Sequence, residues 1–363
     1  MAAGLLWPRE AFPHNPITTT VLFNREVSKI FQQKCVQCHA AGGLAMPLTT
    51  YDEARPWAVA IKEEMLERRM PPWPAERGYG EFANDLGLTI RERDFLISWI
   101  DGGVPAGEGD PPAYMDHSAH WMLGTPDALL TAASGVTIEP GRPLGFSRIV
   151  VNTALTQEKW LRALDYKPAD KRVVRAAVLS IAETGQYLGT WTPWHSTVEM
   201  PAGAAIRMAA RSRIAIDVFY QSASVPVVDT PKLGLYFAAK RPAHEVATTV
   251  LAPQAAPAPA AGASAPRVKA SMVLSKDTSI LEMRPDLGSL GRSVEVKAIR
   301  PDGSSQVLLW IRKVRPEWPT SYVFRKPVTL PKGSTVQAIA YFNPASGQTS
   351  SPFSVTFSSY DAP

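Results

Sequence analysis

The sequence predicts a multidomain α plus all-β protein, in which a small all-α domain precedes two antiparallel β-sandwich (jelly-roll) domains. Apolar residues recur with helical spacing up to about residue 110. After Pro111-Pro112, short runs of alternating apolar and polar residues replace that spacing. A Pro/Ala-rich stretch over 252–266 then divides these runs into two groups. We therefore expect an N-terminal extension over 1–17, a helical domain over 18–110, a first β domain over 111–251, a linker or loop over 252–267, and a second β domain over 268–363.

Three amphipathic helices are expected in the helical domain, at about 20–31, 52–69 and 89–100. The third is followed by Gly102-Gly103, which stops a helix. The apolar faces of the three helices consist of Phe23, Val27, Ile30 and Phe31, of Ala58, Ile61, Met65 and Leu66, and of Phe95, Ile97, Trp99 and Ile100.

The β domains are predicted from half-buried and buried strands. Pro301-Asp302-Gly303-Ser304 is a hairpin turn signal between two of them. Several strands at such spacing favour a sandwich or jelly roll in each unit. The clearest expected strands lie at 173–179, 206–220, 232–237, 294–299, 307–311, 336–342 and 353–357.

Composition sets limits on function. Lys and Arg number 38 against 33 Asp and Glu, so the chain is mildly basic, and no basic block indicates a nucleic-acid arm. No apolar run reaches the roughly 18–20 residues of a membrane span. This balance favours an acidic partner.

The most informative motif is Cys35-Val36-Gln37-Cys38-His39, which contains both cysteines of the chain. This spacing is typical of a c-type haem attachment site. The two thiols can form thioethers to the vinyl groups of one haem, and His39 then becomes an axial ligand of the iron. A structural zinc site would need a second pair of ligands, and a thioredoxin-like CxxC would not need His39. We expect one covalently bound haem c.

The second axial ligand is expected to be Met70. The two prolines that follow it favour an extended strap from which the thioether can reach the iron. Met46 is the main alternative, with a contact at the haem edge as its simpler interpretation. His117 and His120 are further alternatives. With His and Met ligands, such a haem transfers single electrons.

Three amphipathic helices around this motif are similar to a class I cytochrome c. Haem is attached to such a motif outside the cytoplasm, so we expect an exported, periplasmic protein. Met1–Asn15 lacks the basic and apolar regions of a signal peptide. The expectation is that a leader was removed or omitted, or that the numbering starts late.

The whole chain resembles a bacterial family that joins a cytochrome c to a copper type II, ascorbate-dependent monooxygenase-like module. That module is the double jelly roll of the peptidylglycine and dopamine hydroxylases. The helical part matches through the haem motif, Arg55-Pro56-Trp57-Ala58, Met70-Pro71-Pro72-Trp73, Tyr79-Gly80 and Asn84-Asp85. The β part matches through Glu158-Lys159-Trp160, Arg172-Val173-Val174, Gly189-Thr190-Trp191-Thr192-Pro193, Met200-Pro201-Ala202-Gly203, Glu317-Trp318 and Leu330-Pro331-Lys332-Gly333-Ser334.

The resemblance implies two copper sites, but their ligands are missing. Arg175-Ala176 stands where the family has a His-His pair, and Phe219 stands where a further His is expected. The stretch 284–291, which matches the family's His-x-His, has no histidine, and no methionine follows Met283. Copper prefers imidazole ligands. We therefore expect no copper, no oxygenase activity and no catalytic residues.

The sequence thus favours a periplasmic electron-transfer subunit whose metal-free β module docks to redox partners, as part of a membrane-associated respiratory or photosynthetic complex. A haem-fed monooxygenase with an unusual copper site is the first alternative. It requires convergence of two or three of His117, His120, His195 and His244. A ligand-binding module is the second alternative, and it would use Trp191, Trp194 and Trp318.

Overall fold

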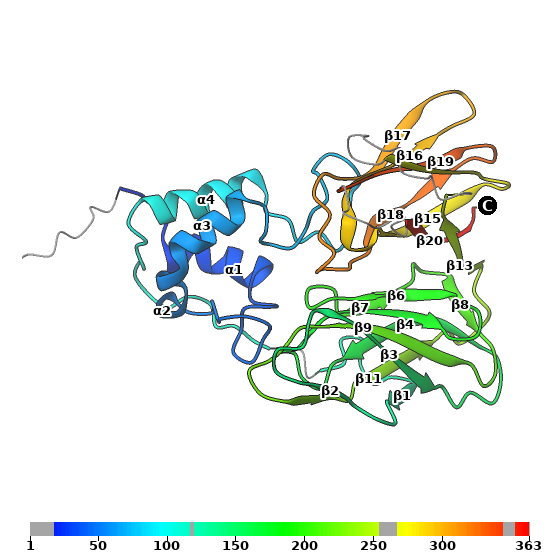
Figure 1. The fold of residues 1–363 in the computed structure, drawn as a ribbon, viewed down its shortest axis with the longest axis horizontal. Helices are drawn as coiled ribbons and strands as arrows, with labels where there is room; N and C mark the ends of the chain where they lie inside the picture. The colour runs from blue at the N-terminus through cyan, green and yellow to red at the C-terminus, as the bar shows by residue number, and fades with distance from the viewer. Residues whose placement is uncertain (1–17, 117–119, 254–266, 344–352, 363) are drawn as a thin grey trace, which may run out of the picture.

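The computed structural model describes residues 18–116, 120–253, 267–343 and 353–362. A helical unit lies beside two β units, and the chain passes through them in order (Figure 1). Most described elements are strands that form several sheets, so the β character of the predicted fold is confirmed, and the described α-helices all precede residue 102. The predicted extension at 1–17, most of the predicted linker, and His14 and His117 lie outside the described residues.

The helical unit packs around a cluster of aromatic rings. Phe23 and Trp99 are fully buried, and the ring centroids of Phe23 and Phe31 lie 6.0 Å apart. Trp99 also donates from Nε1 to the Pro105 carbonyl oxygen at 3.0 Å. The helices of this unit are η1 (Phe23–Val27), α1 (Ser28–Lys34), α2 (Tyr51–Ala54), η2 (Arg55–Trp57), α3 (Ala58–Leu66) and α4 (Ile90–Asp101).

The second predicted helix is shorter than expected and is broken into three pieces. Pro56 lies in η2, between α2 and α3, and Arg68 has a left-handed φ of 56° just after α3 ends. Leu66 was expected on the apolar face, but its side chain is 53% exposed. The final apolar residue of that helix therefore does not contribute to the core.

The first β unit consists of two large sheets and a two-stranded pair. One sheet has the order β1-β11-β4-β8-β12 with β7 on β4, the second has the order β3-β9-β5-β6, and β10 pairs with β2. Its strands are β1 (Ala128–Thr131), β2 (Val136–Ile138), β3 (Gly145–Asn152), β4 (Lys159–Lys167), β5 (Val174–Ile181), β6 (Tyr187–Trp191), β7 (Thr197–Glu199), β8 (Ala204–Met208), β9 (Arg213–Tyr220), β10 (Val227–Asp229), β11 (Lys232–Phe237) and β12 (His244–Glu245).

The second β unit has two four-stranded antiparallel sheets, β13-β20-β15-β18 and β14-β19-β16-β17. The predicted hairpin joins β16 to β17, and Gly303 takes the left-handed φ of 85° that its turn requires. The strands and the short helix of this unit are β13 (Ala247–Leu251), β14 (Arg267–Val273), β15 (Thr278–Asp286), η3 (Gly288–Leu290), β16 (Gly291–Ile299), β17 (Ser305–Ile311), β18 (Tyr322–Leu330), β19 (Thr335–Phe342) and β20 (Ser354–Asp361).

Two segments join units that the sequence treats as separate. The strand β13, which falls inside the predicted first β domain, pairs with β20 of the second unit. The segment over 73–84 belongs to the predicted helical domain, yet Phe82 is buried in the core of the second β unit. Backbone hydrogen bonds fix this segment, including Glu76 N to the Trp310 oxygen at 2.8 Å and Ala83 N to the Val323 oxygen at 2.7 Å. The helical unit is therefore attached directly to the second β unit.

Candidate haem site between the helical and β units

The predicted haem ligands line one cavity in the helical unit. Cys35, Cys38, His39 and Met70 all contribute to its wall. The other helical-unit residues that line it are largely apolar, among them Phe31, Leu48, Ile61, Met65, Leu86, Leu88 and Leu96. An apolar cavity with two thiols and an imidazole matches the donor set that a covalently attached haem requires.

His39 is oriented by a hydrogen bond from its own neighbourhood. Its Nδ1 atom lies 2.9 Å from the Met46 carbonyl oxygen. A carbonyl oxygen only accepts, so Nδ1 carries the proton and Nε2 keeps its lone pair. Burial lowers the pKa of His39, which favours the neutral imidazole that a metal ion binds. This backbone contact fixes the ring as outer contacts commonly do for metal-ligating histidines.

The two cysteines are free thiols; Cys38 is buried and Cys35 is partly buried. Burial raises the pKa of Cys35 to about 12, and the neighbouring Cys38 adds to this effect. Burial likewise raises the pKa of Cys38 to about 12. A redox-active CxxC depends on a stabilised thiolate, which this environment disfavours.

Met70 and Met46 both line the cavity, together with Met65. Because the Met46 carbonyl accepts from Nδ1, the backbone at Met46 lies behind the His39 ring, on the side away from Nε2. Met70 instead comes from the strap after α3, where its N–H donates to the Glu64 carbonyl oxygen at 3.1 Å. This placement favours Met70 over Met46 as the second ligand, which stays a prediction.

Three side chains from the β units complete the cavity wall. Arg175 extends from β5, Gln221 follows β9, and Trp318 precedes β18. Gln221 Nε2 donates to the Leu44 carbonyl oxygen at 2.9 Å and ties this wall to the loop after the haem motif. The sequence singled out Trp318 as a possible ligand-binding residue and Arg175 as standing at a lost copper-ligand position, and it did not single out Gln221. None of the three was expected at the haem site, because they are far apart in the chain and share no motif.

Arg175 is the residue that the resemblance placed at a lost copper-ligand position. Its Nε donates to Gln221 Oε1 at 2.9 Å, and its guanidinium carbon lies 4.7 Å from the centroid of the Trp318 ring. A weaker contact of 3.4 Å runs from Nη1 to the Glu317 carbonyl oxygen. Desolvation lowers the pKa of Arg175, while Glu317 and Cys38 act in the opposite direction.

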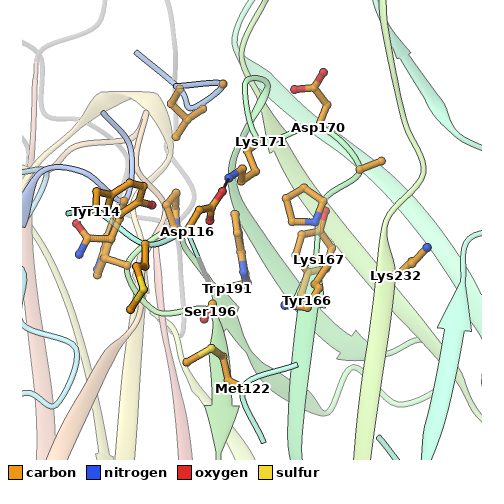
Figure 2. A pocket seen from close by; sticks show the side chains of 18 of the residues that line it. Tyr114, Asp116, Met122, Tyr166, Lys167, Asp170, Lys171, Trp191, Ser196 and Lys232 are labelled. Atoms are coloured by element: carbon orange, nitrogen blue, oxygen red, sulfur yellow. Dashed lines mark hydrogen bonds and ion pairs between the residues drawn. The ribbon is translucent and has the colours of Figure 1, made fainter. Parts of the chain in front are cut away.

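A second, larger cleft of about 1050 Å³ lies next to this cavity (Figure 2). Gln37 and Leu44 line both spaces. Figure 2 shows Asp116 and Lys171 paired across the cleft, at 2.5 Å, with Trp191 below them. Trp194 also lines the cleft, and its ring packs 5.8 Å from that of Trp318 in the haem cavity. The aromatic pair therefore separates the two spaces.

The three tryptophans of the binding-module alternative have different surroundings. Trp191 is buried in the core of the first β unit and packs 5.2 Å from Tyr166. Trp318 is buried against Arg175. Of the three, Trp194 is partly exposed. They do not form one exposed aromatic surface.

The histidines of the copper alternative lie on separate elements. His120 is exposed near the cleft. His195 follows β6, and burial lowers its pKa to about 4. His244 lies in β12 and stacks on Tyr360 at 4.5 Å. Among the described residues, no group of three or more His, Cys, Asp or Glu side chains gathers in a way that could hold a metal ion.

The remaining positions of the expected copper sites carry other contacts. Phe219 packs on Phe146 at 4.8 Å. Arg284 and Asp286, from the stretch that matches the His-x-His, form an ion pair of 3.5 Å. The Phe219–Phe146 pair and the Arg284–Asp286 pair line one cleft between the two β units.

No family model and no curated protein sequence matches this chain. Solved structures align with about two thirds of this chain at low similarity. Recombinant peptide:N-glycanase F is 12% identical, with a TM-score of 0.32 over 65% of this chain and 95% of the glycanase. The major capsid protein P2 of bacteriophage PM2 is 8% identical, with a TM-score of 0.28 over 64% of this chain and 97% of the capsid protein. Similarity at this level carries no argument about function.

Within the described residues, no helix has both the length and the apolar character needed to cross a membrane.

Proposed function

We propose that this protein is a monohaem c-type cytochrome that transfers single electrons, with its β units acting as a docking scaffold. The observation that carries the proposal is the convergence of Cys35, Cys38, His39 and Met70 on one apolar cavity. When bound, the haem iron would supply a reversible one-electron redox couple.

Each residue has a defined part in holding the group. Cys35 and Cys38 would each hold the haem through a thioether, formed by addition of the thiol across a vinyl group. His39 would present Nε2, because the Met46 carbonyl fixes its other nitrogen. Met70 would provide the thioether on the opposite side. Leu96 and the other apolar walls exclude water from the cavity.

The β units support this function by fixing the site from outside. Arg175, Gln221 and Trp318 close the cavity on the side that an isolated helical unit would leave open. The segment over 73–84 anchors the strap of Met70 to the second β unit. We propose that the remaining β surface docks to redox proteins, as subunits of a membrane-associated complex in the periplasm.

Haem attachment is the direct test. The full chain, exported in a bacterium that matures c-type cytochromes, is expected to hold one covalent haem after acid extraction and one iron per chain. Replacement of both Cys35 and Cys38 by Ser should abolish covalent attachment. A wild-type chain that carries no haem under these conditions overturns the proposal.

Metal analysis of the same preparation separates electron transfer from the copper alternative. We expect one iron and no copper per chain after incubation with Cu²⁺ and dialysis. Two coppers per chain, or ascorbate-dependent hydroxylation of a peptide or amine substrate, would contradict a scaffold role for the β units.

A further inference from the structure

We infer that Arg175 raises the reduction potential of the proposed haem by placing a positive charge at the wall of its cavity. This inference rests on the proposed function. The inference adds an electrostatic role for one residue of the β module, which otherwise serves as a scaffold.

The position of Arg175 comes from its neighbours. Its side chain lines the haem cavity, and it interacts electrostatically with the thiol of Cys38. The guanidinium group therefore belongs to the wall of the cavity that the haem would occupy.

The charge of Arg175 is held in place without a direct ion pair. Among the described residues, no carboxylate lies within ion-pair distance of its guanidinium, which donates to the neutral oxygens of Gln221 and of the Glu317 backbone. Glu317 instead pairs with Arg315 at 3.2 Å. The Trp318 ring, 4.7 Å away, stabilises the cation without cancelling its charge.

A fixed cation in this setting favours the reduced haem. Reduction adds one electron to the iron and lowers the charge of the site by one, so attraction to Arg175 increases. The half-buried guanidinium is screened less by salt than a surface charge. At the effective dielectric of such a site, one charge several ångströms from the ring changes the equilibrium constant for reduction by about tenfold.

The test is a redox titration of the full haem-loaded chain against a mediator of known potential. For Arg175→Gln, the equilibrium constant for reduction should fall about tenfold relative to wild type. Arg175→Lys keeps the charge without the planar contacts and should stay within about threefold of wild type. Arg207→Gln is the matched control, because Arg207 is an exposed residue of β8 outside the cavity wall.

Two results would overturn the inference while leaving the proposed function intact. One is an unchanged potential in Arg175→Gln with normal haem content. The other is an equal fall in Arg175→Gln and Arg175→Lys, which would indicate a packing role without a charge effect. Absence of haem from the wild-type chain would overturn the proposed function and the inference together.

Discussion

At the scale of single residues, one backbone contact fixes the orientation of the His39 ring, the predicted iron ligand. Its Nδ1 contacts a backbone oxygen that belongs to Met46, seven positions further along the chain. A backbone acceptor cannot rotate away or titrate, so the direction of Nε2 is fixed before any metal is present. The same contact places the backbone of Met46 on the Nδ1 side of the ring, and Met70 stays the predicted second ligand.

A substitution pair tests this assignment. Met70→Ala should open the sixth position of the iron, so that added imidazole binds at least tenfold more tightly than to wild type and the reduction potential falls. Met46→Ala should leave imidazole binding within about threefold, because Met46 orients His39 through its backbone oxygen, which the substitution keeps. Absorption titrations measure both, and tight binding in the Met46 variant alone would reverse the assignment.

At the scale of elements, α4 shows how local sequence defines a helix boundary. Thr89 accepts from the Glu92 N–H at 3.1 Å, and the Glu92 carboxylate accepts from the Thr89 N–H at 2.6 Å. This capping box satisfies two backbone donors at the start of a helix whose Leu96 and Trp99 face the buried core. The helix therefore begins where the cap is.

Removal of this cap should weaken the helical unit. Thr89→Ala should lower its free energy of unfolding by about 1 kcal/mol, since the Glu92 N–H loses its acceptor. Thr89→Ser keeps the hydroxyl and should cost less than about 0.5 kcal/mol. Urea denaturation followed by the haem absorption measures both values. Equal losses in the two variants would show that the threonine methyl group, and not the cap, is responsible.

At the scale of the whole molecule, buried polar and aromatic contacts join the three units. Asn84 donates to the Ser321 carbonyl oxygen at 2.8 Å and accepts from the Val323 N–H at 3.1 Å. Phe82 packs on Tyr322 at 5.4 Å and on Phe324 at 5.3 Å. Since the strap of Met70 leads directly into this segment, the second β unit restrains the position of the predicted ligand.

Phe82→Ala should test this attachment. Deletion of a ring that is only 5% exposed should destabilise the chain by about 3–5 kcal/mol. We also expect faster protease cleavage within 73–84. Phe146→Ala is the control, because that ring is 51% exposed and its loss should cost less than about 1 kcal/mol. If residues 73–84 of the Phe82→Ala variant resist the protease as well as in wild type, Phe82 does not anchor this segment.

The two β units meet at a buried carboxylate. Glu282 of β15 is 4% exposed. It accepts from Ser358 Oγ at 3.0 Å and from the Tyr187 hydroxyl of β6 at 3.4 Å. Desolvation raises the pKa of Glu282, against smaller opposite effects from these hydroxyl groups and from Arg284. Ionisation of Glu282 therefore opposes folding.

This raised pKa predicts a pH dependence of stability. Below the pKa of an unfolded glutamic acid, the carboxyl is neutral in both the folded and the unfolded state, and its contribution to the free energy of unfolding is fully present. That contribution is lost as the pH rises through the higher pKa of the folded state. Glu282→Gln should therefore gain about 1–3 kcal/mol over wild type at pH 8 and little at pH 4.

Urea denaturation at the two pH values checks this expectation. Glu158→Gln is the matched control, because Glu158 is exposed and pairs only with Arg207 on the surface of the first β unit. It should show no gain that depends on pH. A Glu282→Gln variant that is less stable than wild type at both pH values would show that Glu282 is needed as a hydrogen-bond acceptor in its ionised form.

Much of the local structure could be predicted from the sequence. The position of α4, the hairpin at Gly303 and the alternating strands follow from spacing and turn residues, which depend on neighbours a few positions apart. The break near Pro56 and the exposed Leu66 were missed. An apolar stripe alone does not show where a proline and a left-handed residue will divide a helix.

The sequence by itself determined the chemistry of the site, because the five residues of the haem motif are contiguous and their spacing carries the information. Only the tertiary structure decided what surrounds that motif. Arg175, Gln221 and Trp318 come from two β units and reach one cavity through packing between units. Such contacts leave no periodic pattern or motif in the sequence, because they depend on how the helical unit and the two β units pack against one another. The charge at the edge of the predicted haem site was therefore visible only in the folded molecule.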